Sequence, residues 1–147
     1  MIASLMMCLS VVLLLIGMLG GIVMGIQENF VLAPAHAHLN LVGGVLLFLF
    51  GLYYRLIPAA GRSTLAKAQG WLHMTGAILF PAGVALVVLK GTAFLIAPVL
   101  GSLIVVAAMA LFVVIVFRTA QAYPSGASDG HPIRPPLQVT FRTPTVA

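Results

Sequence analysis

Charged side chains are scarce in this chain of 147 residues, because seven Lys or Arg and two Asp or Glu make up only 6% of it. Water-soluble domains carry about 25% charged residues. Hydrophobic residues reach 62%, and a surface of that composition cannot stay hydrated. The composition therefore excludes a soluble enzyme, a disordered chain and a nucleic-acid-binding protein. It predicts an integral membrane protein whose exterior faces the lipid bilayer.

Cysteine is equally scarce, since Cys8 stands alone in the sequence. A single cysteine excludes an intrachain disulfide and a Cys-x-x-Cys-His haem attachment. The chain also lacks an acyl-transfer triad, a P-loop, a zincin motif and a dinucleotide-binding fingerprint. We therefore expect no independent enzymatic activity, or at most a part in an oxidoreductase.

Four apolar stretches are long enough to cross roughly 30 Å of hydrocarbon as helices, which takes about 20 residues. They cover residues 2–26, 38–58, 70–89 and 92–117. The connections are short, so successive helices should be antiparallel neighbours. The predicted fold is all-α: a polytopic, four-transmembrane-helix antiparallel bundle over residues 1–118. The remainder, residues 119–147, contains five of the nine prolines and is predicted to be a disordered, basic tail.

Basic residues are distributed unevenly around these spans. Six of the seven belong to the second loop and its flanks or to the C-terminal side: Arg55, Arg62, Lys67, Arg118, Arg134 and Arg142. Only Lys90 falls on the opposite face. Because Lys and Arg concentrate on the cytoplasmic side of membrane proteins, both termini and the second loop are predicted to be cytoplasmic. The expected location is the bacterial inner (cell) membrane.

Small residues recur every fourth position in the first span, at Gly17, Gly21 and Gly25. The length of this span, with no basic residue before it, indicates a retained helix rather than a secretory signal. Such glycines let a second helix approach closely; we expect contacts inside one subunit, with a dimer seam as the alternative. Met18 and Met24 are expected to be apolar filler, with soft-metal ligation as the alternative.

Polar residues cluster at the outer end of the second span, where His36, His38, Asn40, Gly43 and Gly44 fall within nine residues. Positions two apart on a helix point about 200° from one another, so the two histidines should face opposite sides. Asn40 should lie one turn below His36, and the glycines should leave room for a flat ligand. Polar groups in hydrocarbon are costly and mark functional sites. We favour a cofactor site over simple headgroup contacts.

His73 lies in an apolar part of the third span, which runs in the opposite direction. Counting from the start of that span places it near the inner leaflet, on the order of 20 Å from His38. At that depth it cannot share an iron or metal with His38 in one subunit. It is a secondary candidate for a site, with a polar contact inside the bundle as the alternative.

The stretch Ala35-His36-Ala37-His38-Leu39-Asn40-Leu41, followed by residues 51–58 (GLYYRLIP), resembles the second helix of the haem-copper oxidase catalytic subunit, and of nitric oxide reductases in particular. The resemblance covers about residues 33–90. It implies haem b, with a histidine at the outer end of this helix as an axial ligand. The family has twelve or more spans in three four-helix arcs, and this chain supplies one arc without the copper-site histidines.

The leading hypothesis is a b-type haem protein that transfers electrons or senses redox state, with His36 and His38 as axial ligands. The alternatives are a copper or other metal carrier that uses these histidines, and a cofactor-free assembly subunit. Because histidines on opposite faces cannot both reach one iron, we expect a homo-oligomer. The resemblance favours a trimer that imitates three arcs, and a two-fold dimer is its rival.

Overall fold

The computed structural model describes residues 1–122, which form helices and contain no strand. Helix α1 covers Ile2–Ile26. The second span combines α2 (Ala33–His38), the π-helix η1 (Leu39–Leu46) and α3 (Leu47–Leu56). After the short helix α4 (Pro58–Gly61) come α5 (Thr64–Lys90), the 3₁₀ turn η2 (Thr92–Phe94) and α6 (Ile96–Ala122).

Four of these helical spans are long and apolar enough to cross a membrane. This confirms the predicted all-α class and the membrane character. The first span has the predicted bounds, but the second begins at Ala33 and the third at Thr64, five and six residues earlier than expected. The fourth continues to Ala122, so the first four residues of the predicted tail are helical, and the rest of that tail lies outside the described residues.

Local chemistry explains the early starts. Pro34 lies in the first turn of α2, where a missing backbone N–H costs nothing. At α5 the Ser63 hydroxyl accepts a hydrogen bond from the Ala66 N–H at 3.1 Å, as an N-cap does. Polar residues such as Lys67 and Gln69 lower the hydrophobicity of this first part of α5, so a prediction from hydrophobicity places the start of the helix too late.

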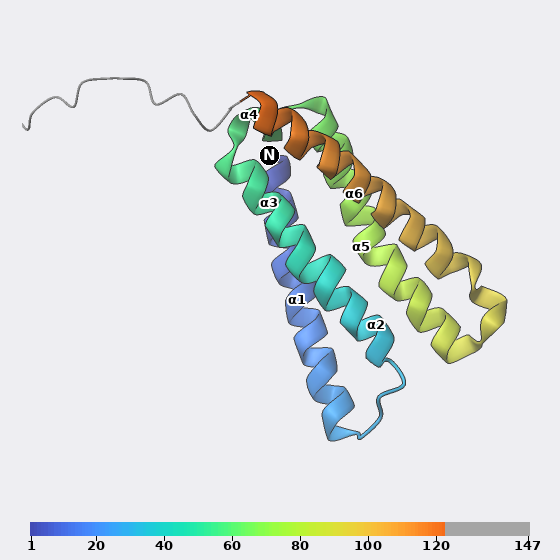
Figure 1. Cartoon of the computed structure of the whole chain (residues 1–147). Helices are drawn as coiled ribbons and strands as arrows, with labels where there is room; N and C mark the ends of the chain where they lie inside the picture. Colours follow the sequence, from blue (N-terminus) through green and yellow to red (C-terminus); the bar gives the residue numbers. More distant parts are fainter. Residues whose placement is uncertain (123–147) are drawn as a thin grey trace, which may run out of the picture.

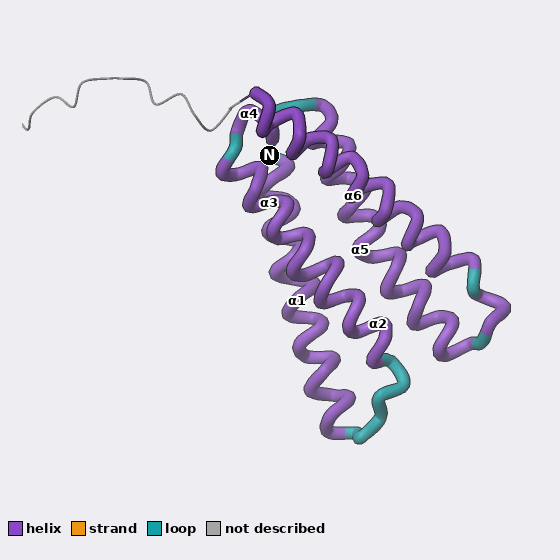
Figure 2. Tube along the Cα trace, in the orientation of Figure 1, coloured by secondary structure: helices purple, strands orange, loops and turns teal. Residues whose placement is uncertain are grey.

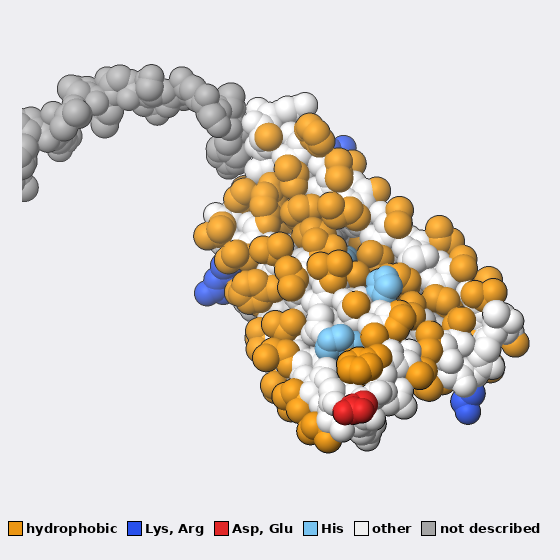
Figure 3. Space-filling model, turned by 60° about the horizontal axis from the view of Figure 1, so that its bottom comes forward, with side chains coloured by type: hydrophobic (Ala, Val, Ile, Leu, Met, Phe, Trp, Pro, Cys, Tyr) orange, Lys and Arg blue, Asp and Glu red, His pale blue; other side chains and the backbone are white. Residues whose placement is uncertain are grey.

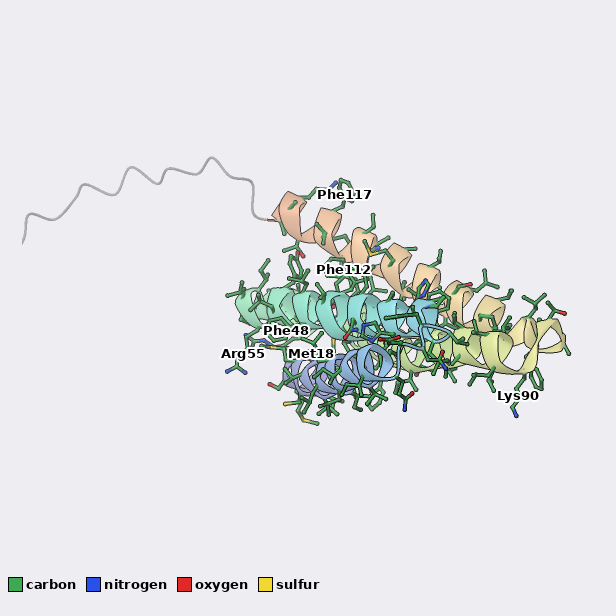
Figure 4. The ribbon with its side chains drawn as sticks, turned by 90° about the horizontal axis from the view of Figure 1, so that it is seen from below. Met18, Phe48, Arg55, Lys90, Phe112 and Phe117 are labelled. Atoms are coloured by element: carbon green, nitrogen blue, oxygen red, sulfur yellow. The ribbon has the colours of Figure 1, made fainter. Side chains whose placement is uncertain are left out.

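The spans pack as two antiparallel hairpins, α1 with the second span and α5 with α6 (Figures 1 and 2). The N-terminus, α4 and the end of α6 share one end of the molecule, whereas the loops after α1 and α5 lie at the other (Figure 1). For the described part of the chain, this confirms the prediction that the N-terminus, the second loop and the end of the fourth span share one face, opposite the first and third loops. Arg55 and Lys90 mark these opposite ends (Figure 4).

Glycines bring the backbones of α5 and α6 together. A Cβ atom on Gly83 would lie 2.5 Å from the backbone nitrogen of Pro98, and one on Gly101 would lie 2.6 Å from Cα of Phe80. Only a residue without a side chain fits such distances. The second hairpin therefore depends on these two positions.

The core lies where α1, α3 and α5 meet, around Met6, Leu47, Phe50 and Met74. Phe112 extends the core to α6, since its ring lies 4.2 Å from the ring of Phe50. Most other large apolar side chains of α1 and α6 are exposed, as a lipid-facing surface requires. Hydrophobic side chains accordingly dominate the surface in Figure 3.

Candidate functional site

His36 and Asn40 occupy the same face of the second span and pack against α1. The Asn40 amide nitrogen lies 3.1 Å from Nε2 and 3.3 Å from Nδ1 of His36, and it also donates to the His36 carbonyl at 3.1 Å. A Cβ on Gly21 would lie 2.9 Å from Cε1 of His36, and one on Gly17 would overlap the Asn40 amide. The predicted proximity of Asn40 and His36 is confirmed.

The glycine series of α1 therefore serves contacts within one subunit. Gly17 and Gly21 make room for side chains of the second span, whereas a Cβ on Gly25 would meet nothing within 4 Å. This confirms the preferred interpretation for two of the three glycines. Of the three glycines, Gly25 alone has an open face that could contact another chain.

His38 faces a different neighbour, as the two-residue spacing predicts. Its ring packs edge-on against Phe80 of α5, with ring centroids 4.5 Å apart. Its Nδ1 lies 2.7 Å from the Pro34 carbonyl oxygen. A carbonyl oxygen only accepts, so Nδ1 carries the proton and Nε2 presents a lone pair. Histidines that bind metals are held in this manner by their second ring nitrogen.

A pocket of about 630 Å³ opens between the C-terminal halves of α1 and α5, beside His36. Its walls are almost entirely apolar: α1 contributes Ile16, Gly20, Val23 and Met24, and α5 contributes Ile78, Pro81 and Ala85. A Cβ on Gly20 would meet nothing within 4 Å, so the α1 backbone is bare there. In Figure 3, imidazoles reach the surface among hydrophobic side chains at this end of the molecule.

Gly43 and Gly44 do not leave room for a flat ligand. A Cβ on Gly43 would lie 3.0 Å from Cδ1 of Leu13, and one on Gly44 would lie 2.7 Å from Cδ1 of Leu14. Both leucines belong to α1, so the space that the glycines vacate is filled by helix packing. The bare backbone lies instead at Gly20, which sequence reasoning missed because Gly20 is outside the four-residue series.

His73 is fully buried, and it lies closer to His38 than the expected distance on the order of 20 Å. Its Nε2 is 3.1 Å from the carbonyl oxygen of Val42, four residues beyond His38 and roughly 6 Å further along the second span. The reason is the early start of α5 at Thr64, which places His73 roughly 14 Å into that helix. The two histidines therefore approach one another more closely than a start of the third span at Gly70 would allow.

A second polar group in the core was also missed. The Tyr54 hydroxyl donates to Oε1 of Gln69 at 2.9 Å, and both side chains are buried. The available signal was the four-residue spacing of Gln69 and His73, which places both on one face of α5. A tyrosine at the end of a membrane span is typical of an interfacial position, so the burial of Tyr54 is visible only in the fold.

Across residues 1–122, no three His, Cys, Asp or Glu side chains lie close enough together to hold a metal ion. Met18 is 59% exposed, whereas Met24 lines the pocket with His36. In comparisons with known proteins, no family model, no curated protein and no solved structure matches this chain. The resemblance to haem-copper oxidases therefore stays a prediction from residues 33–90.

Proposed function

We propose that this chain is a b-type haem-binding membrane protein that transfers electrons or senses redox state. The observation that carries the proposal is the apolar pocket of about 630 Å³ with His36 on its wall. Cofactor pockets in proteins are of roughly 300–1,000 Å³ and are mostly apolar with few polar groups. The resemblance of residues 33–90 to the haem-binding helix of haem-copper oxidases agrees with it.

The residues of the pocket fit a haem. The bare α1 backbone at Gly20 accepts a flat ring, and apolar side chains such as Val23 and Ile78 exclude water from it. Asn40 is the group that orients the His36 imidazole: its amide nitrogen donates to the His36 carbonyl oxygen and lies 3.1 Å from the ring Nε2. The haem, when bound, supplies one-electron chemistry.

Within residues 1–122, a single subunit does not present two imidazoles to the pocket. His36 lies on the α1 side, whereas His38 packs against Phe80 with its Nε2 lone pair available. We therefore retain the proposal of a homo-oligomer, in which His38 of one copy completes the ligation at His36 of the next. Ligands on opposite faces require head-to-tail contacts, which close into a ring. A trimer is favoured, and a two-fold dimer is the alternative.

A copper carrier is the second candidate, because thioether and imidazole ligands suit copper and Met24 shares the pocket with His36. An absorption spectrum of the purified protein after haem-replete expression separates the two functions. We expect a Soret band and a six-coordinate low-spin spectrum on reduction. Copper without a Soret band would support the carrier, and a colourless, metal-free, monomeric protein would contradict both.

The proposed orientation in the bacterial inner membrane has the N-terminus and the α4 end in the cytoplasm. In a Cys8→Ala background, a cysteine replacing the exposed Ala59 should react with a membrane-impermeant maleimide only after the membrane is opened. A cysteine at the exposed Thr92 should react in intact spheroplasts, because η2 lies at the opposite end. The reverse pattern would invert the proposed topology, which rests on the charge distribution.

A further inference from the structure

The buried polar groups of α5 lie apart from the His36 pocket and form a second feature of the bundle. His73 and Gln69 are each 0% exposed, and Tyr54 is 2% exposed. The two α5 side chains are one helical turn apart, a rise of roughly 6 Å. They lie in the half of the bundle that contains the N-terminus and α4, because Gln69 is only five residues from the start of α5.

The hydrogen bonds already made determine what each remaining atom can do. The Val42 carbonyl can only accept, so Nε2 of His73 carries the proton and Nδ1 is an acceptor. The Tyr54 hydroxyl donates to Oε1 of Gln69, which leaves the amide N–H groups of Gln69 as donors. Nε2 of Gln69 and Nδ1 of His73 are both buried without a partner. A donor and an acceptor thus lie unused, one turn apart, on the same face.

We propose that Gln69 and His73 bind an internal water molecule and form with it a proton-accepting site within the membrane. Buried waters typically bond to otherwise unsatisfied buried polar groups. The water oxygen accepts from Nε2 of Gln69, and the water donates to Nδ1 of His73. Tyr54 is a positioning residue, since its hydroxyl holds the Gln69 amide with its nitrogen toward His73.

The same water allows His73 to take up a proton. A proton from hydronium adds to the Nδ1 lone pair and leaves a neutral water molecule, which then accepts from Nδ1–H while Val42 still accepts from Nε2–H. Tyr54 is the other titratable side chain among the buried residues of the described chain, and Asp, Glu, Lys and Arg are absent from that buried set. Phe50 from α3 lies edge-on to the imidazole, with centroids 4.8 Å apart, and Met6 from α1 packs at Gly70. The other buried polar side chain of the described chain, Ser10 of α1, donates to the Met7 carbonyl. None of these groups places a fixed charge beside the imidazole.

Solid-state ¹⁵N NMR of histidine-labelled protein in lipid nanodiscs tests the proposal without any haem. The His73 signals are assigned as those absent from His73→Asn. We expect an Nε2–H tautomer at neutral pH, magnetisation transfer from water to the His73 ring, and protonation of both nitrogens in acid. In Gln69→Met, which keeps the side-chain length, water transfer should fall about tenfold because one of the two partners of the water is lost.

Tyr54→Phe should weaken the water contact, whereas Tyr53→Phe is the matched control and should leave it unchanged, because Tyr53 packs against Phe112 and makes no bond to Gln69. A wild-type His73 ring without water contact would overturn the proposal. That result would indicate a dry core in which Gln69 bonds directly to Nδ1 of His73. This outcome is read from the wild-type protein alone, so it stands even where a variant fails to fold.

Discussion

His36→Ala is expected to remove haem from the purified protein, with haem content falling about tenfold or more. The reason is that His36 lies on the wall of the apolar pocket, and no second imidazole from residues 1–122 of the same subunit lines that wall. Haem content and reduced-minus-oxidised spectra measure the effect. His38→Ala should abolish the six-coordinate spectrum too, and native mass should show a weaker assembly, because His38 is proposed to act on the neighbouring copy.

Two further variants make this prediction specific. His73→Ala should leave the haem spectrum unchanged, since His73 bonds to Val42 in the core and does not line the pocket. Asn40→Leu should retain the iron ligand but lower haem affinity about tenfold, as loss of an orienting partner does. A spectrum that responds only to His73→Ala would move the cofactor to the core site, and full haem content in His36→Ala would refute the pocket assignment.

Gly101→Ala is expected to destabilise the bundle by about 1–3 kcal/mol, the range found when a packed interior receives an extra methyl group. The new Cβ would lie 2.6 Å from Cα and 2.7 Å from the backbone nitrogen of Phe80. Backbone atoms cannot rotate away as a side chain does, so α5 and α6 must separate. Gly83→Ala should behave alike, because its Cβ would meet the backbone of Ala97 and Pro98.

Thermal unfolding in lipid nanodiscs, followed by circular dichroism, measures this effect. Gly25→Ala is the matched control: it makes the same substitution in a membrane helix, where the Cβ meets nothing within 4 Å. Its stability should stay within about 1 kcal/mol of wild type, given the small helix preference for Ala over Gly. Equal losses in Gly25→Ala and Gly101→Ala would show that close packing of α5 and α6 is not the cause.

The number, order and pairing of the spans could be predicted because hydrophobic length and short loops determine them directly. The opposed directions of His36 and His38 also followed from helical geometry alone. Helix ends were less accessible, because polar residues such as Lys67 continue α5 beyond its apolar part. The error in the start of α5 carried over to the distance between His73 and His38.

The pocket and the core polar group could not be derived from sequence, because both depend on which faces meet. Gly43 and Gly44 suggested open space, but the leucines of α1 fill it. Gly20 lies outside the series of Gly17, Gly21 and Gly25, yet the α1 backbone at the pocket is bare at this position. Tyr54 stands at the end of the second span, where tyrosines are common at membrane boundaries, and only the fold shows that Gln69 accepts a hydrogen bond from its hydroxyl.

The π-helix η1 divides the second span into two parts that are out of phase. Each i→i+5 turn includes about one more residue than an α-turn, which corresponds to roughly 100° of rotation. His36 and Asn40 before or at its start thus face α1, while Phe50 and Tyr54 after it face the core side of α5. Removing one residue between Leu39 and Leu46 would restore a uniform helix and turn one part about its axis relative to the other. The length of this segment therefore sets the angle between His36, which lines the pocket, and Tyr54, which bonds to Gln69 in the core. A natural insertion or deletion there would turn these two side chains relative to one another without altering either of them.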